Sequence, residues 1–133
     1  MIDLLETERI KKEIEENPSN VTQSIESTPT IGICITNSLG LFVEVNTAYT
    51  QIYGYDKSRL LGKSFLMVVP DENKANMEIL HKKFLKDKTE IAREWEVVGE
   101  DGKRISISVD AGYSEDIFDK TPHKITFIQQ QVG

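Results

Sequence analysis

The sequence predicts an α+β fold in which helices lie on one face of an antiparallel sheet. Three observations support this prediction: two short β-branched runs within residues 30–45, several helical patterns between residues 46 and 88, and three alternating runs from residue 90 onward. From residue 30 onward, strands come first and last while the helices stay together between them, so these helices are expected to cover one side of a single sheet.

Composition favours one ordinary globular domain. The chain has 133 residues, of which 38% are hydrophobic and 29% are charged, which suffices for a single core and is not typical of a disordered chain. Its formal net charge is −6, so its surface repels phosphate backbones. We therefore expect no nucleic-acid partner.

The single cysteine and the charged N-terminus predict a cytoplasmic domain. One thiol, Cys34, can form neither an internal disulfide nor a cysteine-rich zinc site, and we expect it to be a small buried residue. No apolar run approaches the roughly 20 residues of a membrane span, and residues 1–18 are too charged for a signal peptide. We expect no direct membrane contact; any spanning segment would lie outside this sequence.

The N-terminal segment reads as two helices that meet at Asn17-Pro18. Residues 2–16 carry an irregular apolar stripe, and residues 18–27, capped by Asn17, place Val21 and Ile25 on one face. The first helix either packs against a partner or the domain, or remains a solvated arm. We accordingly divide the chain into a flanking helix, residues 1–17, and a main domain, residues 18–133.

An antiparallel hairpin is expected over residues 30–45, where "NSLG" supplies the turn, and short helices follow it. Asn46 is a good N-cap for the first, and Gly54 suits the left-handed residue that ends it. The next helix begins at Asp56 and directs Leu60 and Leu61 inward.

A longer helix over residues 72–88, capped by Asp71, places Met77, Leu80, His81 and Phe84 on one face. Three strands follow over residues 90–98, 103–113 and 123–132, the first two joined by the "GEDG" turn. The middle strand alternates apolar and polar residues, as in a sheet with one covered face. His123 falls beside Pro122 in a loop, where we expect exposure to solvent.

The run "ITNSLGLFVEVNTAYTQIYGYDKSRLLGKSF", followed later by "GEDGKRISISV", resembles a PAS domain. The features that carry the resemblance are Gly40, Asn46, "YGY" around Gly54, Leu60-Leu61-Gly62 and Asp101-Gly102. It covers about residues 21–132. It implies a five-stranded antiparallel sheet bent around short helices and a small pocket, here with an extra N-terminal helix. In this reading Asn46, Gly54 and Gly62 specify the fold and perform no chemistry.

The resemblance raises two cofactors, and the residues disfavour both. Flavin photochemistry requires a cysteine in the short helix after the second glycine, where this chain reads "GKSFL" with Ser64. Heme-binding relatives use a histidine of the long helix, which here is His81, whereas Met77 stands nearer the family's usual ligand position. The cofactor therefore stays unknown, with none expected and heme or flavin as alternatives; no metal site is expected.

Several residues are candidates for lining a pocket. Arg93 either holds a carboxylate or phosphate at the cavity mouth or pairs with a neighbouring glutamate. Trp95 and the nearby tyrosines either line a pocket for a small apolar or aromatic molecule or fill that space themselves. The full candidate set is Tyr49, Tyr53, Met77, His81, Phe84, Arg93, Trp95 and Ile107.

By resemblance, the function is that of a cytosolic sensory and protein-interaction module in a prokaryotic signalling protein. The outputs that the resemblance implies are a two-component histidine kinase, a cyclic-di-nucleotide enzyme or a chemoreceptor. The sequence shows no nucleophile–base pair or phosphate-binding loop, so we expect no enzyme here and any catalytic output in another domain. The expected partners are a possible small-molecule ligand, a downstream signalling domain and a second copy bound through the N-terminal helix and the sheet, with Leu4, Leu5, Ile10 and Ile14 available on that helix. The alternatives are a heme- or flavin-binding sensor and a ligand-free dimerisation scaffold.

Overall fold

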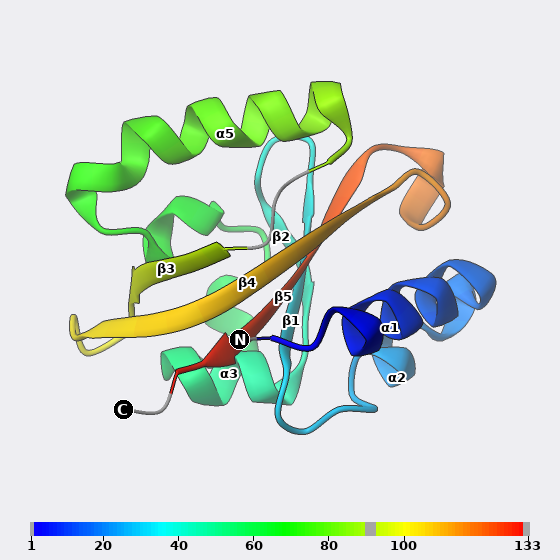
Figure 1. The fold of residues 1–133 in the computed structure, drawn as a ribbon, viewed down its shortest axis with the longest axis horizontal. Coiled ribbons are helices and arrows are strands. Elements are labelled where there is room, and N and C mark those ends of the chain that lie inside the picture. Colours follow the sequence, from blue (N-terminus) through cyan, green and yellow to red (C-terminus); the bar gives the residue numbers. More distant parts are fainter. Residues whose placement is uncertain (1, 90–92, 132–133) are drawn as a thin grey trace.

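The computed structural model describes residues 2–89 and 93–131 and contains one five-stranded antiparallel sheet (Figure 1). The strand order is β2-β1-β5-β4-β3, so the C-terminal strand lies in the centre. The strands are β1 Gly32–Asn37, β2 Phe42–Val45, β3 Arg93–Val98, β4 Arg104–Ser114 and β5 His123–Gln130. The predicted α+β class is confirmed. The part of the predicted first C-terminal strand at residues 90–92 lies outside the described residues.

The helices are α1 Leu4–Glu16, α2 Val21–Ser24, α3 Thr47–Tyr53, α4 Lys57–Leu60 and α5 Lys74–Asp87, with 3₁₀ turns at η1 Pro18–Asn20, η2 Phe65–Val68, η3 Asp71–Asn73 and η4 Phe118–Lys120. Two predicted helices differ in detail from the structure. The helix expected over residues 18–27 is a 3₁₀ turn followed by one α-helical turn. The long helix begins three residues after Asp71, whose carboxylate pairs with Lys74 Nζ at 2.7 Å instead of capping the helix.

The predicted cap residues determine where α3 begins and ends. The Asn46 side chain accepts a hydrogen bond from Tyr49 N at 2.9 Å, and Gly54 ends the helix with φ 79°. The helix packs closely on β1 at Gly32, where an added Cβ would lie 3.1 Å from the Cα of Tyr49. This close contact holds Tyr49 and Tyr53 over the inner face of the sheet.

Apolar side chains cover both faces of the sheet, which corrects the prediction of a single covered face. On the outer face, Ile10 and Ile14 of α1 are completely buried against a cluster that includes Ile33, Ile125 and Phe127. Figure 1 shows α1 and α5 on opposite sides of the strands. Polar side chains of β4 on the α1 side of the sheet are covered as well. The alternation of apolar and polar residues in this strand therefore does not indicate a solvent-exposed face.

The N-terminal helix is therefore part of the fold, and the reading as a solvated arm was wrong. Besides its isoleucines, α1 makes polar contacts with β4. Thr7 Oγ1 donates to Asp110 Oδ2 at 2.5 Å, and Ser114 Oγ donates to Glu15 Oε2 at 2.9 Å. The irregular stripe suffices because the outer sheet face presents a matching apolar surface. The division into residues 1–17 and 18–133 stays a prediction.

Two single-residue expectations were also wrong. His123 is only 2% exposed because it begins β5, pairs with Asn37 and Ser114 on both sides, and places Nδ1 2.7 Å from Thr121 O. Leu60 is fully buried as expected, but Leu61 is 36% exposed because the chain leaves the helical conformation at that residue. Within residues 2–89 and 93–131, the structure contains no helix with both the length and the apolar character needed to cross a membrane.

Candidate functional site

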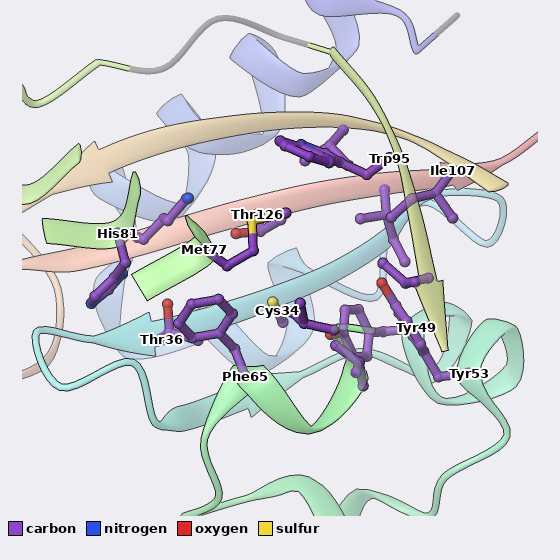
Figure 2. Close-up of a pocket in the computed structure, with 16 residues that line it drawn as sticks. Cys34, Thr36, Tyr49, Tyr53, Phe65, Met77, His81, Trp95, Ile107 and Thr126 are labelled. Atoms are coloured by element: carbon purple, nitrogen blue, oxygen red, sulfur yellow. The ribbon is translucent and has the colours of Figure 1, made fainter. Parts of the chain in front are cut away.

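A cavity of about 100 Å³ lies between the inner face of the sheet and the segments α3, η2 and α5 (Figure 2). Its walls are mostly apolar, with a few hydroxyl, thiol, imidazole and amino groups. The lining residues are Cys34, Thr36, Tyr49, Tyr53, Phe65, Val68, Val69, Met77, His81, Trp95, Val97, Ile107, Val109, Lys124, Thr126 and Ile128. The cavity is thus the interior space that separates the helices from the sheet.

The strand side of the cavity follows from register and the two-residue period of strands. Thr36 of β1 is the Cα partner of Lys124 in β5, and Cys34 is the partner of Thr126. Successive side chains alternate between faces, so these four residues point inward while their neighbours face α1. On the same face, toward the β3 edge of the sheet, Trp95 of β3 pairs with Ile107 of β4 in the same way.

The innermost polar groups are neutral. Burial raises the pKa of the Cys34 thiol to about 11, against smaller opposing effects of hydrogen bonds with Tyr49 and Thr126 and of the Lys124 charge. Burial also raises the pKa values of Tyr49 and Tyr53, whose ring centroids are 4.4 Å apart. At neutral pH these groups hold their protons, so they can form hydrogen bonds with a ligand but do not act as bases or nucleophiles.

His81 is buried at the wall formed by α5. Its Nε2 lies 3.0 Å from Ser38 O, and its ring lies 5.4 Å from the Phe65 ring, which fixes it against the β1–β2 turn.

Ligand pockets for drug-sized molecules enclose roughly 300–1,000 Å³, several times the volume found here. Heme and flavin are at least that large, so neither fits this cavity as it stands.

The structure brings together six of the eight candidate residues. Tyr49, Tyr53, Met77, His81, Trp95 and Ile107 line the cavity, and Figure 2 shows all six around it. Phe84 is buried outside the lining, with Lys124 Nζ 4.6 Å from its ring centroid. Arg93 is exposed, and its guanidinium lies over the Trp95 ring at 5.3 Å from the centroid. That any of them contacts a ligand stays a prediction.

Residue-by-residue reasoning missed most of the β1 and β5 lining. Cys34 was expected to be buried, as it is, but its place in the cavity wall was not foreseen, and neither were those of Thr36, Lys124 and Thr126. Strand alternation alone groups Lys124 with Thr126 on one face of β5. It cannot tell which of the two faces meets the cavity, because both faces of the sheet are covered.

Residues 21–123 match the family model described as "PAS fold". The chain belongs to the PAS family. PAS domains are sensory and signalling modules and typically have no catalytic activity of their own. No curated protein matches the chain.

Solved PAS domains share its architecture at low sequence identity. The PAS domain of an HTR-like protein from Haloarcula marismortui is 21% identical, with a TM-score of 0.68 over 93% of this chain and 99% of that one. A PAS domain from a two-component sensor histidine kinase is 14% identical, with a TM-score of 0.66 over 94% and 99%. Drosophila melanogaster Cycle PAS-B, solved with bound ethylene glycol, is 16% identical, with a TM-score of 0.65 over 75% and 99%.

Proposed function

We propose that this PAS domain is a cytoplasmic sensory module that binds a small, largely apolar molecule in its cavity. The observation that carries the proposal is the cavity itself, an interior space of about 100 Å³ walled by apolar side chains with a few hydrogen-bonding groups. Pockets of this composition bind ligands by apolar burial and use their few polar groups to orient them. Cycle PAS-B, which has bound ethylene glycol, is a relative that takes up a small molecule.

The size of the cavity limits the ligand. Apolar cavities of about 150 Å³ in proteins bind benzene. A space of about 100 Å³ therefore suits a molecule with fewer heavy atoms than benzene. A larger ligand would require α5 or η2 to move away from the sheet. Movement of this kind is also how a signal would arise, because a ligand changes a protein's state only if it binds two states with different affinity.

The signal would leave the domain through β5, whose Thr126 and Ile128 line the cavity. We infer that the receiver is a catalytic domain in the same prokaryotic signalling protein, with a two-component histidine kinase as the leading candidate. The likeness to a PAS domain of a two-component sensor histidine kinase supports this inference.

Trp95 provides a direct test because it lines the cavity and is the only tryptophan in the chain. Addition of ethylene glycol or n-butanol should change its fluorescence in a saturable way. The variant Thr126→Ile should abolish the response because the larger side chain occupies the cavity. The control Thr30→Ile, at an exposed position, should respond as the wild type does. Responses that never saturate, or that survive in Thr126→Ile, would contradict binding in this cavity.

Homodimerisation is a second proposed role, and a specific surface favours it. Leu4 and Leu5 at the start of α1 are exposed, Leu5 to 82%. Two such neighbouring side chains would be buried if a second copy packed on this end of the helix. Ile10 and Ile14, which we had also expected to be available, are already buried within the chain. A ligand-free dimer would be the remaining alternative if Trp95 gave no response.

A further inference from the structure

The two halves of α5 are held to the rest of the domain in different ways. The buried residues of the helix are His81 and Phe84, and both belong to its second half. In the first half, residues 74–80, no residue is fully buried, and Met77 is the one that lines the cavity. Figure 1 shows the first half on the β3 side of the domain and the second half toward the β1–β2 turn. The first half thus adjoins the cavity without a packed core to hold it.

Direct contacts anchor the second half. His81 Nε2 lies 3.0 Å from Ser38 O in the β1–β2 turn. Lys124 Nζ of β5 lies 4.6 Å from the ring centroid of Phe84, so the charge of the lysine is stabilised by the aromatic face. The β1–β2 turn and β5 therefore both keep this half in place.

A charge network holds the first half. Arg104, at the start of β4, donates two hydrogen bonds to Glu72 of η3, from Nη1 to Oε2 at 2.5 Å and from Nη2 to Oε1 at 3.1 Å. Its Nη1 also donates to Glu96 Oε1 of the edge strand β3 at 3.0 Å. Among the described residues, no other hydrogen bond or ion pair joins residues 71–80 to the sheet. Because η3 leads directly into α5, the Arg104 guanidinium connects the start of this helix with β3 and β4.

The network can break without loss of the core. The side chains of Arg104, Glu72 and Glu96 are between 47% and 57% exposed. Single surface ion pairs add little stability, but an arginine that forms paired hydrogen bonds within a network does contribute. Dissolved salt weakens the attraction because all three charges are in contact with water. A local opening of the first half is therefore accessible while the buried second half stays packed.

We propose that Glu72, Arg104 and Glu96 form a salt-sensitive latch that controls access to the cavity. When the contact between Glu72 and Arg104 breaks, the first half of α5 lifts from the sheet and the cavity opens beside Met77. This inference rests on the proposed small-molecule function and supplies its entry route, but its test requires no ligand.

Cys34 reports the movement because it is the only cysteine of the chain, lines the cavity and is 4% exposed. Methyl methanethiosulfonate, an uncharged reagent too large for the closed cavity, modifies a thiolate that it can reach. At low reagent concentration, the rate of modification measured by mass spectrometry follows the population of the open state. Arg104→Gln should raise this rate about fivefold, the upper end for an exposed ion pair. Glu72→Gln should do the same, and the double variant should not exceed Arg104→Gln, because both substitutions break one latch.

Arg9→Gln is the matched control. Arg9 also contacts two glutamates, Glu6 and Glu13, and its side chain is 50% exposed, but it lies on α1. Its loss should leave the modification rate of Cys34 at the wild-type value. An increase in sodium chloride from about 20 mM to about 500 mM should speed modification of the wild type and of Arg9→Gln, and should have little effect on Arg104→Gln.

The outcomes separate the latch from the binding function. An unchanged rate in Arg104→Gln overturns the latch, as does an equal increase in Arg9→Gln, which would mean a general loss of stability. Modification of the wild type with the urea dependence of complete unfolding also overturns it. In each case a saturable response of Trp95 to ethylene glycol would leave binding in the cavity standing. If Cys34 follows the latch but Trp95 gives no saturable response, the movement of α5 stands and control of ligand access fails together with the small-molecule function.

Discussion

Asn46 uses all four hydrogen-bonding positions of its side-chain amide inside the protein. Its Oδ1 accepts from Ile33 N at 2.8 Å and from Tyr49 N at 2.9 Å. Its Nδ2 donates to Ile25 O at 2.6 Å and to Ile31 O at 3.0 Å. One side chain thereby joins the outer-face segment after α2, the first residues of β1 and the helix that closes the cavity. The sequence identified the helix cap but not the other three bonds.

Substitution of Asn46 by alanine should destabilise the domain by about 3 kcal/mol, since it leaves several buried backbone groups without partners. Urea unfolding of Asn46→Ala and wild type would measure the difference in the free energy of unfolding. Asn17→Ala is the control, because Asn17 is exposed and its side chain donates one long hydrogen bond, from Nδ2 to Glu13 O at 3.5 Å. The control should change stability by about 0.5 kcal/mol or less. A loss below about 1 kcal/mol in Asn46→Ala would show that water replaces its bonds.

At the scale of elements, α1 has two faces with different roles. One face holds Ile10 and Ile14 against the outer side of the sheet, and Thr7 and Glu15 bond to β4 at its edges. The start of the helix presents Leu4 and Leu5 to solvent. Because the apolar surface under α1 is large, removal of the whole helix would expose the sheet and would not test dimerisation cleanly. Single substitutions separate the two faces.

Ile14→Ala should destabilise the domain by about 3 kcal/mol, because it opens a cavity in the outer-face cluster. Leu5→Ala, on the same helix but exposed, should change the free energy of unfolding by about 0.5 kcal/mol or less. Chemical denaturation of both variants measures the contrast. Equal effects of the two substitutions would mean that α1 does not pack on the sheet in solution.

At the scale of the whole molecule, the sheet separates an outer packed layer from an inner layer with a cavity. The outer cluster is filled by isoleucines from α1, β1 and β5, and the inner cluster is built from tyrosines, valines and Trp95 around open space. The outer layer therefore supports the sheet, and the inner layer can change its packing when a ligand enters. The apolar tip of α1 remains the surface proposed for a second copy.

If that tip forms a dimer interface, Leu5→Glu should convert a dimer into a monomer by placing a charge in an apolar contact. Multi-angle light scattering at matched protein concentrations would measure the molar mass. Leu39→Glu is the control, because Leu39 is equally apolar and exposed but lies in the β1–β2 turn. A wild-type monomer, or a Leu5→Glu dimer, would rule out this interface.

Local patterns predicted the elements well because their causes are local. Asn46 and Gly54 fix the ends of α3 through bonds and backbone angles that involve only nearby residues. Alternation in β3 and β4 placed Trp95 and Ile107 on one inner face. Burial at His123 and the cavity position of Lys124 could not be predicted this way. Both depend on β5 pairing with β1, a strand about ninety residues earlier.

The sequence by itself therefore determined which segments become strands and helices, and which family architecture they build. Only the tertiary structure decided that α1 covers the outer face, that Arg93 stays outside the lining, and that Lys124 enters the cavity. The physical reason is that both faces of a strand carry buried side chains when both sides of the sheet are covered by other elements. The strand's own sequence then does not show which face meets the helices and which meets the cavity. What packs on each face is set by partners distant in the chain.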